Sequence, residues 1–223
     1  MQGQRAELDW REGGVPVSVR FDDPYFSLDD GLAETRYVFL DGNGLPGRFA
    51  PGFHVAELGF GTGLNFLATW AAWDAAGVEG PLHFTSFEAF PMSRDQMAQA
   101  LQAFPDLSGF SDPLMDLWQP EGGVFDLGNA RLTVIVGDAR TALPDWRGQA
   151  DAWFLDGFSP AKNPELWEEG LLAEVGRHTA AGGTVATYTA AGFVRRGLET
   201  AGFHVTRRPG FGRKRHMTVG VRP

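Results

Sequence analysis

The chain has 223 residues, of which 43% are hydrophobic and 21% are charged, so it is long enough to form one globular domain with a sizeable core. It has no cysteine, which excludes disulfide bonds, iron–sulfur clusters, thiolate zinc sites and a cysteine nucleophile, and no metal site is predicted. The net charge is -9, the N-terminus is polar and no apolar run approaches the roughly 20 residues that span a bilayer, so we expect a cytoplasmic protein without membrane association.

The first 50 residues are expected to form an N-terminal extension, packed on a catalytic domain of residues 51–223. Residues 10–48 have the pattern of short strands and turns, with turn signals at residues 22–24 and 41–44. The apolar run 38–40 before the second turn is predicted to be a short strand.

After residue 52, predicted strands alternate with predicted helices, which indicates a parallel sheet covered on both faces. Strands are predicted at residues 53–58, 82–87, 132–136, 152–155, 183–189, 203–207 and 217–221. Helices are predicted at residues 64–76, from 93 onward, 164–179 and 193–201, and residues 105–123 carry no clear pattern. The expected fold is therefore α/β and Rossmann-like, with a mostly parallel seven-stranded sheet that ends in an antiparallel edge hairpin.

A glycine-rich turn follows the first of these strands, where Gly59, Gly61 and Gly63 alternate with Phe60 and Thr62. Such a turn lets the backbone approach a ligand closely. The spacing does not match the dinucleotide fingerprint, and no lysine completes a P-loop. With the acid Glu57 two residues before the first glycine, it resembles the first motif of class I S-adenosylmethionine methyltransferases. A turn without any ligand is the alternative.

Acidic residues also end the next strands. Glu88 follows the second strand, where it can accept both ribose hydroxyls of a nucleoside. Asp138 follows the third strand, where it can accept a hydrogen bond from an adenine amino group. A solvent-facing loop acid at Glu88 and a helix N-cap at Asp138 are the alternatives.

The fourth strand is followed by residues 156–167, DGFSPAKNPELW. A carboxylate at this place faces the methyl group in a methyltransferase, and Asp156 is expected to accept a proton from an attacking amine, directly or through water. Positioning and desolvation would supply most of the catalysis. A helix cap at Asp156 and core packing of Phe158 and Trp167 are the alternatives.

Basic residues gather near the C-terminus. Residues 195–223 contain eight basic residues and one acidic residue, a charge of +7, which leaves -16 in residues 1–194. Such asymmetry suggests binding of a polyanion. An ordinary basic pair of strands is the alternative.

The long motif 156–167 resembles the signature of the tRNA 5-methylaminomethyl-2-thiouridine methyltransferase family, which comprises the methyltransferase domain of MnmC and its stand-alone form MnmD. Other stretches resemble the same family in the same order, and together they cover about residues 10–220. These stretches are residues 21–27, 34–40, 56–67, 86–88 with Pro91, 190–198 and 210–215.

The resemblance implies transfer of a methyl group from S-adenosyl-L-methionine to the exocyclic amine of 5-aminomethyl-2-thiouridine at the tRNA wobble position. It also implies a chain without the family's flavin-dependent oxidase domain, so that a separate oxidase would supply the amine. The tRNA set, the need for the thio group and the oligomeric state do not follow from it.

The resemblance also assigns roles by position. Catalysis would involve Asp156, Phe158 and Pro160. The cofactor would contact Glu57, Gly59, Phe60, Gly61, Thr62, Gly63, Asn65, Glu88, Asp138, Ala139 and Asp156. The tRNA would contact Tyr25, Phe26, Lys162, Arg195, Arg196, Arg213, Lys214 and Arg215.

Three other functions remain open on the residues alone. A class I methyltransferase acting on a small amine or on another RNA would share the acids at the strand ends. A catalytically silent RNA-binding module would be expected to lack one of the glycines or acids of the cofactor turn. An aminopropyltransferase shares the fold, but its acidic pocket would not call for a basic cluster at residues 213–215.

Overall fold

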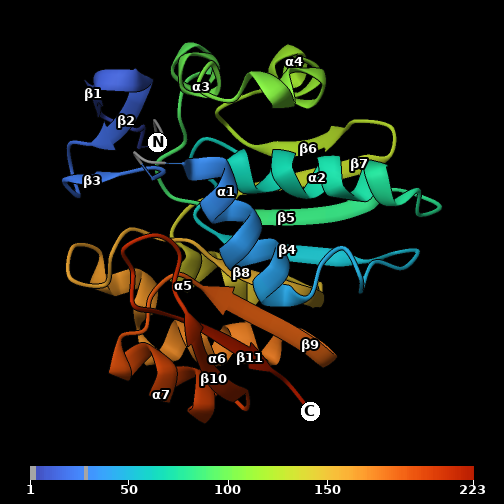
Figure 1. The fold of residues 1–223 in the computed structure, drawn as a ribbon, viewed down its shortest axis with the longest axis vertical. Helices are drawn as coiled ribbons and strands as arrows, with labels where there is room; N and C mark the ends of the chain where they lie inside the picture. Colours follow the sequence, from blue (N-terminus) through green and yellow to red (C-terminus); the bar gives the residue numbers. More distant parts are fainter. Residues whose placement is uncertain (1–3, 28–29) are drawn as a thin grey trace.

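The computed structural model describes residues 4–27 and 30–223 and contains two β-sheets (Figure 1). The larger sheet has eight strands in the order β10-β11-β9-β8-β4-β5-β7-β6. Its five central strands are parallel, whereas β6, β10 and β11 pair in antiparallel fashion. The bounds are β4 His54–Leu58, β5 Leu82–Glu88, β6 Gly123–Asp126, β7 Ala130–Val136, β8 Ala150–Leu155, β9 Thr179–Thr187, β10 His204–Pro209 and β11 His216–Val221. The expected α/β fold with an antiparallel edge hairpin is confirmed.

The sheet has one strand more than the seven expected, because β6 adds to the edge beside β7. Three of its four residues are exposed, and only Phe125 is buried. A short edge strand flanked by glycines buries too little to show alternation in the sequence. The short length and exposure of β6 at the sheet edge explain why no strand is predicted there from the sequence.

Helices cover both faces of the sheet and bury two apolar cores. One core is formed with α1 Gly31–Thr35, α2 Leu64–Ala76, α3 Arg94–Leu101 and α4 Ser108–Leu117, and the other with α5 Ala139–Ala142, α6 Glu169–Arg177 and α7 Gly192–Thr200. The start of α3 is fixed by a capping box, in which Ser93 and Gln96 satisfy each other's backbone N–H groups. The strands are therefore buried on both sides, as their apolar sequences predicted.

The N-terminal segment forms its own three-stranded antiparallel sheet of β1 Leu8–Arg11, β2 Val15–Ser18 and β3 Asp23–Pro24. Figure 1 shows this small sheet in blue, at the end of the main sheet where the central strands finish. The residues that follow α1 pack into the same core as α2. A boundary between an extension and a domain at residue 50 stays a prediction.

Two predicted elements were wrong. Residues 38–40 are not a strand, because they lie in a π-helix, Arg36–Leu40, with all three side chains buried against the sheet. A three-residue apolar run does not distinguish a strand from a buried helical turn. The helix expected at 164–179 is interrupted at Glu168, whose ψ of 144° separates the 3-10 helix Pro164–Trp167 from α6. The strand β9 begins directly after α6, at Thr179.

Within residues 4–27 and 30–223, no helix is both long and apolar enough to cross a membrane. The longest, α2, has 13 residues, whereas a span needs roughly 20. The same described residues contain no group of three or more histidine, aspartate or glutamate side chains arranged to hold a metal ion. The cytoplasmic location stays a prediction.

Candidate functional site

A cavity of about 1190 Å³ opens at the carboxyl ends of the central strands. This volume exceeds the roughly 300–1,000 Å³ of an ordinary small-molecule pocket. Most of the predicted site residues line it, and these are Tyr25, Phe26, Gly59, Phe60, Gly61, Thr62, Asn65, Glu88, Asp138, Ala139, Asp156, Phe158, Arg213 and Lys214. Seven others do not line it, namely Glu57, Gly63, Pro160, Lys162, Arg195, Arg196 and Arg215.

The glycine turn after β4 requires glycine for two separate reasons. Gly59, Gly61 and Gly63 have φ angles of 91°, 55° and 77°, which residues with a side chain rarely adopt. A Cβ atom on Gly59 would also lie 2.7 Å from the backbone oxygen of Asp156, and one on Gly61 would lie 3.1 Å from the Tyr25 ring. The turn therefore presents bare backbone to the cavity.

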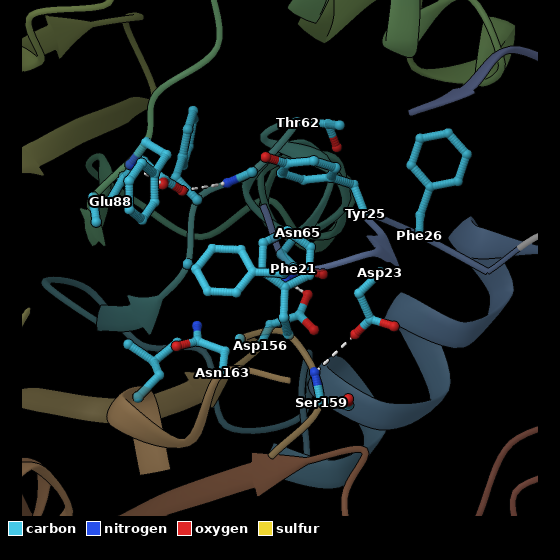
Figure 2. Close-up of a pocket in the computed structure, with 18 of the residues that line it drawn as sticks. Phe21, Asp23, Tyr25, Phe26, Thr62, Asn65, Glu88, Asp156, Ser159 and Asn163 are labelled. Carbon is cyan, nitrogen blue, oxygen red and sulfur yellow. Dashed lines mark hydrogen bonds between the residues drawn. The ribbon is translucent and has the colours of Figure 1, made fainter. Parts of the chain in front are cut away.

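Two acids at this edge are joined by one amide. Asn65, in the first turn of α2, donates hydrogen bonds of 2.8 Å to Glu57 and 2.7 Å to Asp156 through its Nδ2 atom (Figure 2). Its oxygen accepts a bond from the Thr35 hydroxyl, and Ser86 donates a second bond to Glu57. Glu57 is fully buried and does not line the cavity. By accepting the bond from Asn65, it fixes the position of Asn65 and of the turn from below the cavity surface.

Asp156 is the carboxylate of this network that faces the cavity. Burial raises its pKa from 3.8 to about 7, with Glu34 acting in the same direction, while the bond from Asn65 and the charge of Lys214 lower it. A carboxylate with a pKa near neutrality can both accept and release a proton at physiological pH. The role of Asp156 in proton transfer stays a prediction.

The raised pKa of Asp156 has a consequence for stability. Between about pH 4 and pH 7 the folded state binds more protons at this group than the unfolded state, so stability falls as the pH rises through that window. We expect the free energy of unfolding of the wild type to decrease relative to Asp156→Asn over this range and to run parallel to it above. Urea unfolding of both ligand-free proteins at several pH values tests this, and parallel curves throughout would contradict the raised pKa.

Glu88, at the end of β5, bonds the glycine turn with one carboxylate oxygen and the segment that follows β5 with the other. It accepts bonds of 2.9 Å from the backbone N–H of Gly61 and 2.7 Å from that of Phe90. Burial raises its pKa, and these backbone bonds lower it. Because each carboxylate oxygen carries a second lone pair, Glu88 retains acceptor capacity towards the cavity.

Asp138 caps α5 by accepting a bond from the backbone N–H of Arg140. The Arg140 guanidinium also bonds this carboxylate, at 2.6 Å, and lowers its pKa. Arg140 reaches Glu168 as well, at 3.2 Å. The N-cap alternative is therefore present in the structure, and a contact with adenine would be additional to it.

An aromatic cluster forms one wall of the cavity. Phe21 stacks on Phe158 with ring centroids 4.8 Å apart, and Tyr25 and Phe90 meet these two rings edge-on. Sequence reasoning missed Phe21 and Phe90, although both lie in or beside stretches that resemble the family. Phe26 lies apart from the Asp156 carboxylate in Figure 2 and packs on Phe104 instead.

The N-terminal segment is tied to the loop that carries Asp156. Asp23 accepts a 2.8 Å bond from the backbone N–H of Ser159 (Figure 2). Lys162 bonds the backbone oxygen of Asp22 and pairs with the carboxylates of Asp22 and Asp23. Lys162 therefore already has anionic partners, which argues against its predicted contact with RNA phosphate. Pro160 lies in the same loop, outside the cavity lining.

Only two of the basic residues predicted to contact tRNA line the cavity. Arg213 and Lys214 line it from the β10–β11 loop, whereas Arg215 follows them outside the lining, and Arg195 and Arg196 lie on α7. Lys214 pairs with Glu34 and lies 4.2 Å from the centroid of the Tyr188 ring. Tyr188 and Glu34 were missed, although Tyr188 directly follows β9, where ligands of parallel sheets bind.

Comparisons with known proteins show which proteins the chain is similar to. A family model described as S-adenosyl-L-methionine-dependent methyltransferase matches residues 115–223. The tRNA 5-methylaminomethyl-2-thiouridine biosynthesis bifunctional protein MnmC of Aeromonas hydrophila subsp. hydrophila is 48% identical over 97% of this chain and 35% of its own length. The protein of that name from Hahella chejuensis is also 48% identical, over 97% of this chain and 36% of its own. The chain spans about a third of the length of these curated relatives.

Solved structures share the fold. The crystal structure of MNMC2 from Aquifex aeolicus superposes with a TM-score of 0.71 and 25% identity, covering 100% of this chain and 73% of that chain. A spermidine synthase in complex with the transition-state analogue AdoDATO superposes with a TM-score of 0.60 and 12% identity, over 100% of this chain and 72% of that chain. The second likeness concerns the fold alone.

Proposed function

Because this chain belongs to the family of S-adenosyl-L-methionine-dependent methyltransferases, we propose that it methylates the exocyclic amine of 5-aminomethyl-2-thiouridine at the tRNA wobble position. The product is 5-methylaminomethyl-2-thiouridine. The observation that carries the proposal is Asp156, a carboxylate with a pKa near neutrality that faces a cavity large enough for a cofactor and a nucleoside. The separate oxidase that would supply the amine stays a prediction.

The hydrogen-bonding groups that line the cavity fit S-adenosyl-L-methionine. The bare glycine backbone at residues 59–63 suits a ligand that lies directly on the turn. The spare acceptor capacity of Glu88 suits ribose hydroxyls, and Asp138 and Ala139, which line the cavity, are proposed to contact the adenine. When bound, the cofactor supplies a methyl group on a positively charged sulfur.

Asp156 would then receive a proton from the substrate. The amine arrives largely as an ammonium ion and attacks only when it is neutral, so it must first lose a proton. Asn65 holds Asp156 in one orientation, because its amide is itself fixed by Glu57 and Thr35. The lone pair of the neutral nitrogen would then be available to bond the methyl group that the cofactor supplies, with the sulfur as the leaving group, and the proton would leave Asp156 to solvent.

The aromatic wall supports an unpaired base as the acceptor. Phe21 and Phe158 stack on each other at the cavity, and a flipped anticodon base is recognised by stacking and by contacts to its edges. Arg213, which also lines the cavity, suits a contact with phosphate.

A small-molecule amine is the second candidate, because the same acids would serve it. The two hypotheses, a tRNA acceptor and a small-molecule acceptor, are distinguished by two rates. One is the rate of methyl transfer to tRNA that carries the aminomethyl group, and the other is the rate of transfer to the isolated nucleoside. Our proposal predicts much faster transfer to the tRNA at equal amine concentration. Equal rates, or a preference for the free nucleoside, would favour the small-molecule acceptor.

Glu88 offers a test of the cofactor site. We expect Glu88→Gln to weaken binding of S-adenosyl-L-methionine by roughly tenfold or more, because an amide replaces a charged acceptor of hydroxyl and backbone N–H donors. Isothermal titration calorimetry measures this directly. Unchanged affinity in a folded variant would contradict the role of Glu88.

A further inference from the structure

The Lys214–Glu34 ion pair lies in the lining of the cavity. The Lys214 ammonium is 2.6 Å from Glu34 Oε1, and both residues line the cavity. The Glu34 side chain is 13% exposed, whereas that of Lys214 is 46% exposed. Glu34 belongs to α1, in a region packed on the main core, whereas Lys214 comes from the turn between β10 and β11.

Both charges act on the carboxylate that faces the substrate. Glu34 raises the pKa of Asp156 and Lys214 lowers it. Tyr188, beneath the Lys214 ammonium, donates a 2.7 Å hydrogen bond to the backbone oxygen of Gly157, directly after Asp156. A lysine ammonium therefore occupies a pocket formed by a carboxylate and an aromatic face, close to Asp156.

The substrate carries the same kind of group. A primary amine on a methylene is protonated near neutral pH, so the aminomethyl group and the lysine end both present an alkylammonium. A carboxylate and an aromatic face are general recognition elements for such cations. Resting on the function proposed above, we propose that the substrate ammonium displaces Lys214 from Glu34, and that the released Lys214 then pairs with an RNA phosphate.

This exchange leaves every charge paired. Glu34 is too buried to lose its partner without cost, and the incoming ammonium replaces that partner. Lys214 is half-exposed, so its pairing is the kind that is readily exchanged in water. Lys162 contrasts with it, because three oxygens of Asp22 and Asp23 hold its ammonium.

Binding of two tRNAs tests the exchange. One carries 5-aminomethyl-2-thiouridine and the other 2-thiouridine, and both are titrated against the S-adenosylhomocysteine complex, in which no turnover occurs. We expect the wild type to prefer the aminomethyl tRNA, and Glu34→Gln to lose roughly tenfold or more of that preference. The affinity of Glu34→Gln for S-adenosylhomocysteine and its melting temperature report that the cavity is intact.

The variant Lys214→Met tests the role of Lys214 separately from that of Glu34. We expect it to bind both tRNAs more weakly, with a salt slope smaller by about 0.7 for one lost phosphate contact, and to keep or increase the preference for the amine. Glu169→Gln, which removes one negative charge as Glu34→Gln does but on the exposed first turn of α6, should behave as the wild type.

If the wild-type enzyme methylates the aminomethyl tRNA, two results would overturn the proposed exchange of Lys214 while leaving the proposed function intact. One is a Glu34→Gln variant that retains the full preference, and the other is a Lys214→Met variant that loses it. A wild-type enzyme that does not methylate the aminomethyl tRNA would overturn both this inference and the proposed function.

Discussion

Replacing Asp156 with asparagine is expected to lower kcat for tRNA methylation by at least roughly 100-fold, which is the lower range for loss of a general base. Asparagine keeps the shape of the side chain and an oxygen that can accept the bond from Asn65. It cannot accept a proton from the substrate ammonium. The affinity for S-adenosyl-L-methionine should stay close to that of the wild type, because the glycine turn and Glu88 are unchanged.

Single-turnover rates and calorimetric affinities measure the two effects separately. Asp145→Asn serves as the matched control, since Asp145 is exposed in a 3-10 helix outside the cavity lining. Undiminished turnover in a folded Asp156→Asn protein would remove Asp156 from the chemistry.

Gly59→Ala should damage both stability and the site. Its φ of 91° strains any residue with a side chain, and the added Cβ would lie 2.7 Å from the backbone oxygen of Asp156. Backbone in a buried strand end moves only at a cost, so we expect a loss of roughly 3 kcal/mol or more in the free energy of unfolding. Binding of S-adenosyl-L-methionine should weaken as well, because the turn and the Asp156 loop shift together.

Gly80→Ala separates strain from steric clash. Gly80 has a φ of 81°, and no heavy atom lies within 4 Å of a Cβ built on it. This variant should lose only about 1 kcal/mol and keep its affinity for the cofactor. Urea unfolding and calorimetry of the two variants measure the difference, and equal losses would show that the contact with Asp156 has no consequence.

The sheet was predictable because its central strands are buried on both faces. Their continuous apolar sequences, and the glycine turn before α2, mark each strand end in the sequence. The family resemblance drawn from the motifs is confirmed by the matched relatives. By contrast, β6 buries only one residue, and the apolar run 38–40 is too short to distinguish a strand from a helical turn.

The electrostatics of the site could not be predicted, since they depend on contacts between distant segments. Lys162 and Lys214 appeared in the sequence as free cations for phosphate, yet each pairs with an acid from the N-terminal segment. Asp138, by contrast, pairs with Arg140, only two residues further along the chain. The acids at the strand ends were found because topology alone brings them to one edge of the sheet.

The aromatic wall illustrates a second limit. Phe158 was selected for its place in the long motif, but its stacking partner Phe21 comes from a segment more than a hundred residues earlier. Only folding of the small sheet onto the Asp156 loop brings the two rings together. The role of Phe26 and Tyr25 in contact with tRNA stays a prediction.

Transfer of a labelled methyl group from S-adenosyl-L-methionine to tRNA lacking the final wobble methylation tests the central claim most directly. The tRNA is then digested and its nucleosides are separated. We predict label in 5-methylaminomethyl-2-thiouridine, with none when the tRNA lacks the aminomethyl group. Absence of label in that nucleoside, in a protein that binds the cofactor, would contradict the assigned substrate.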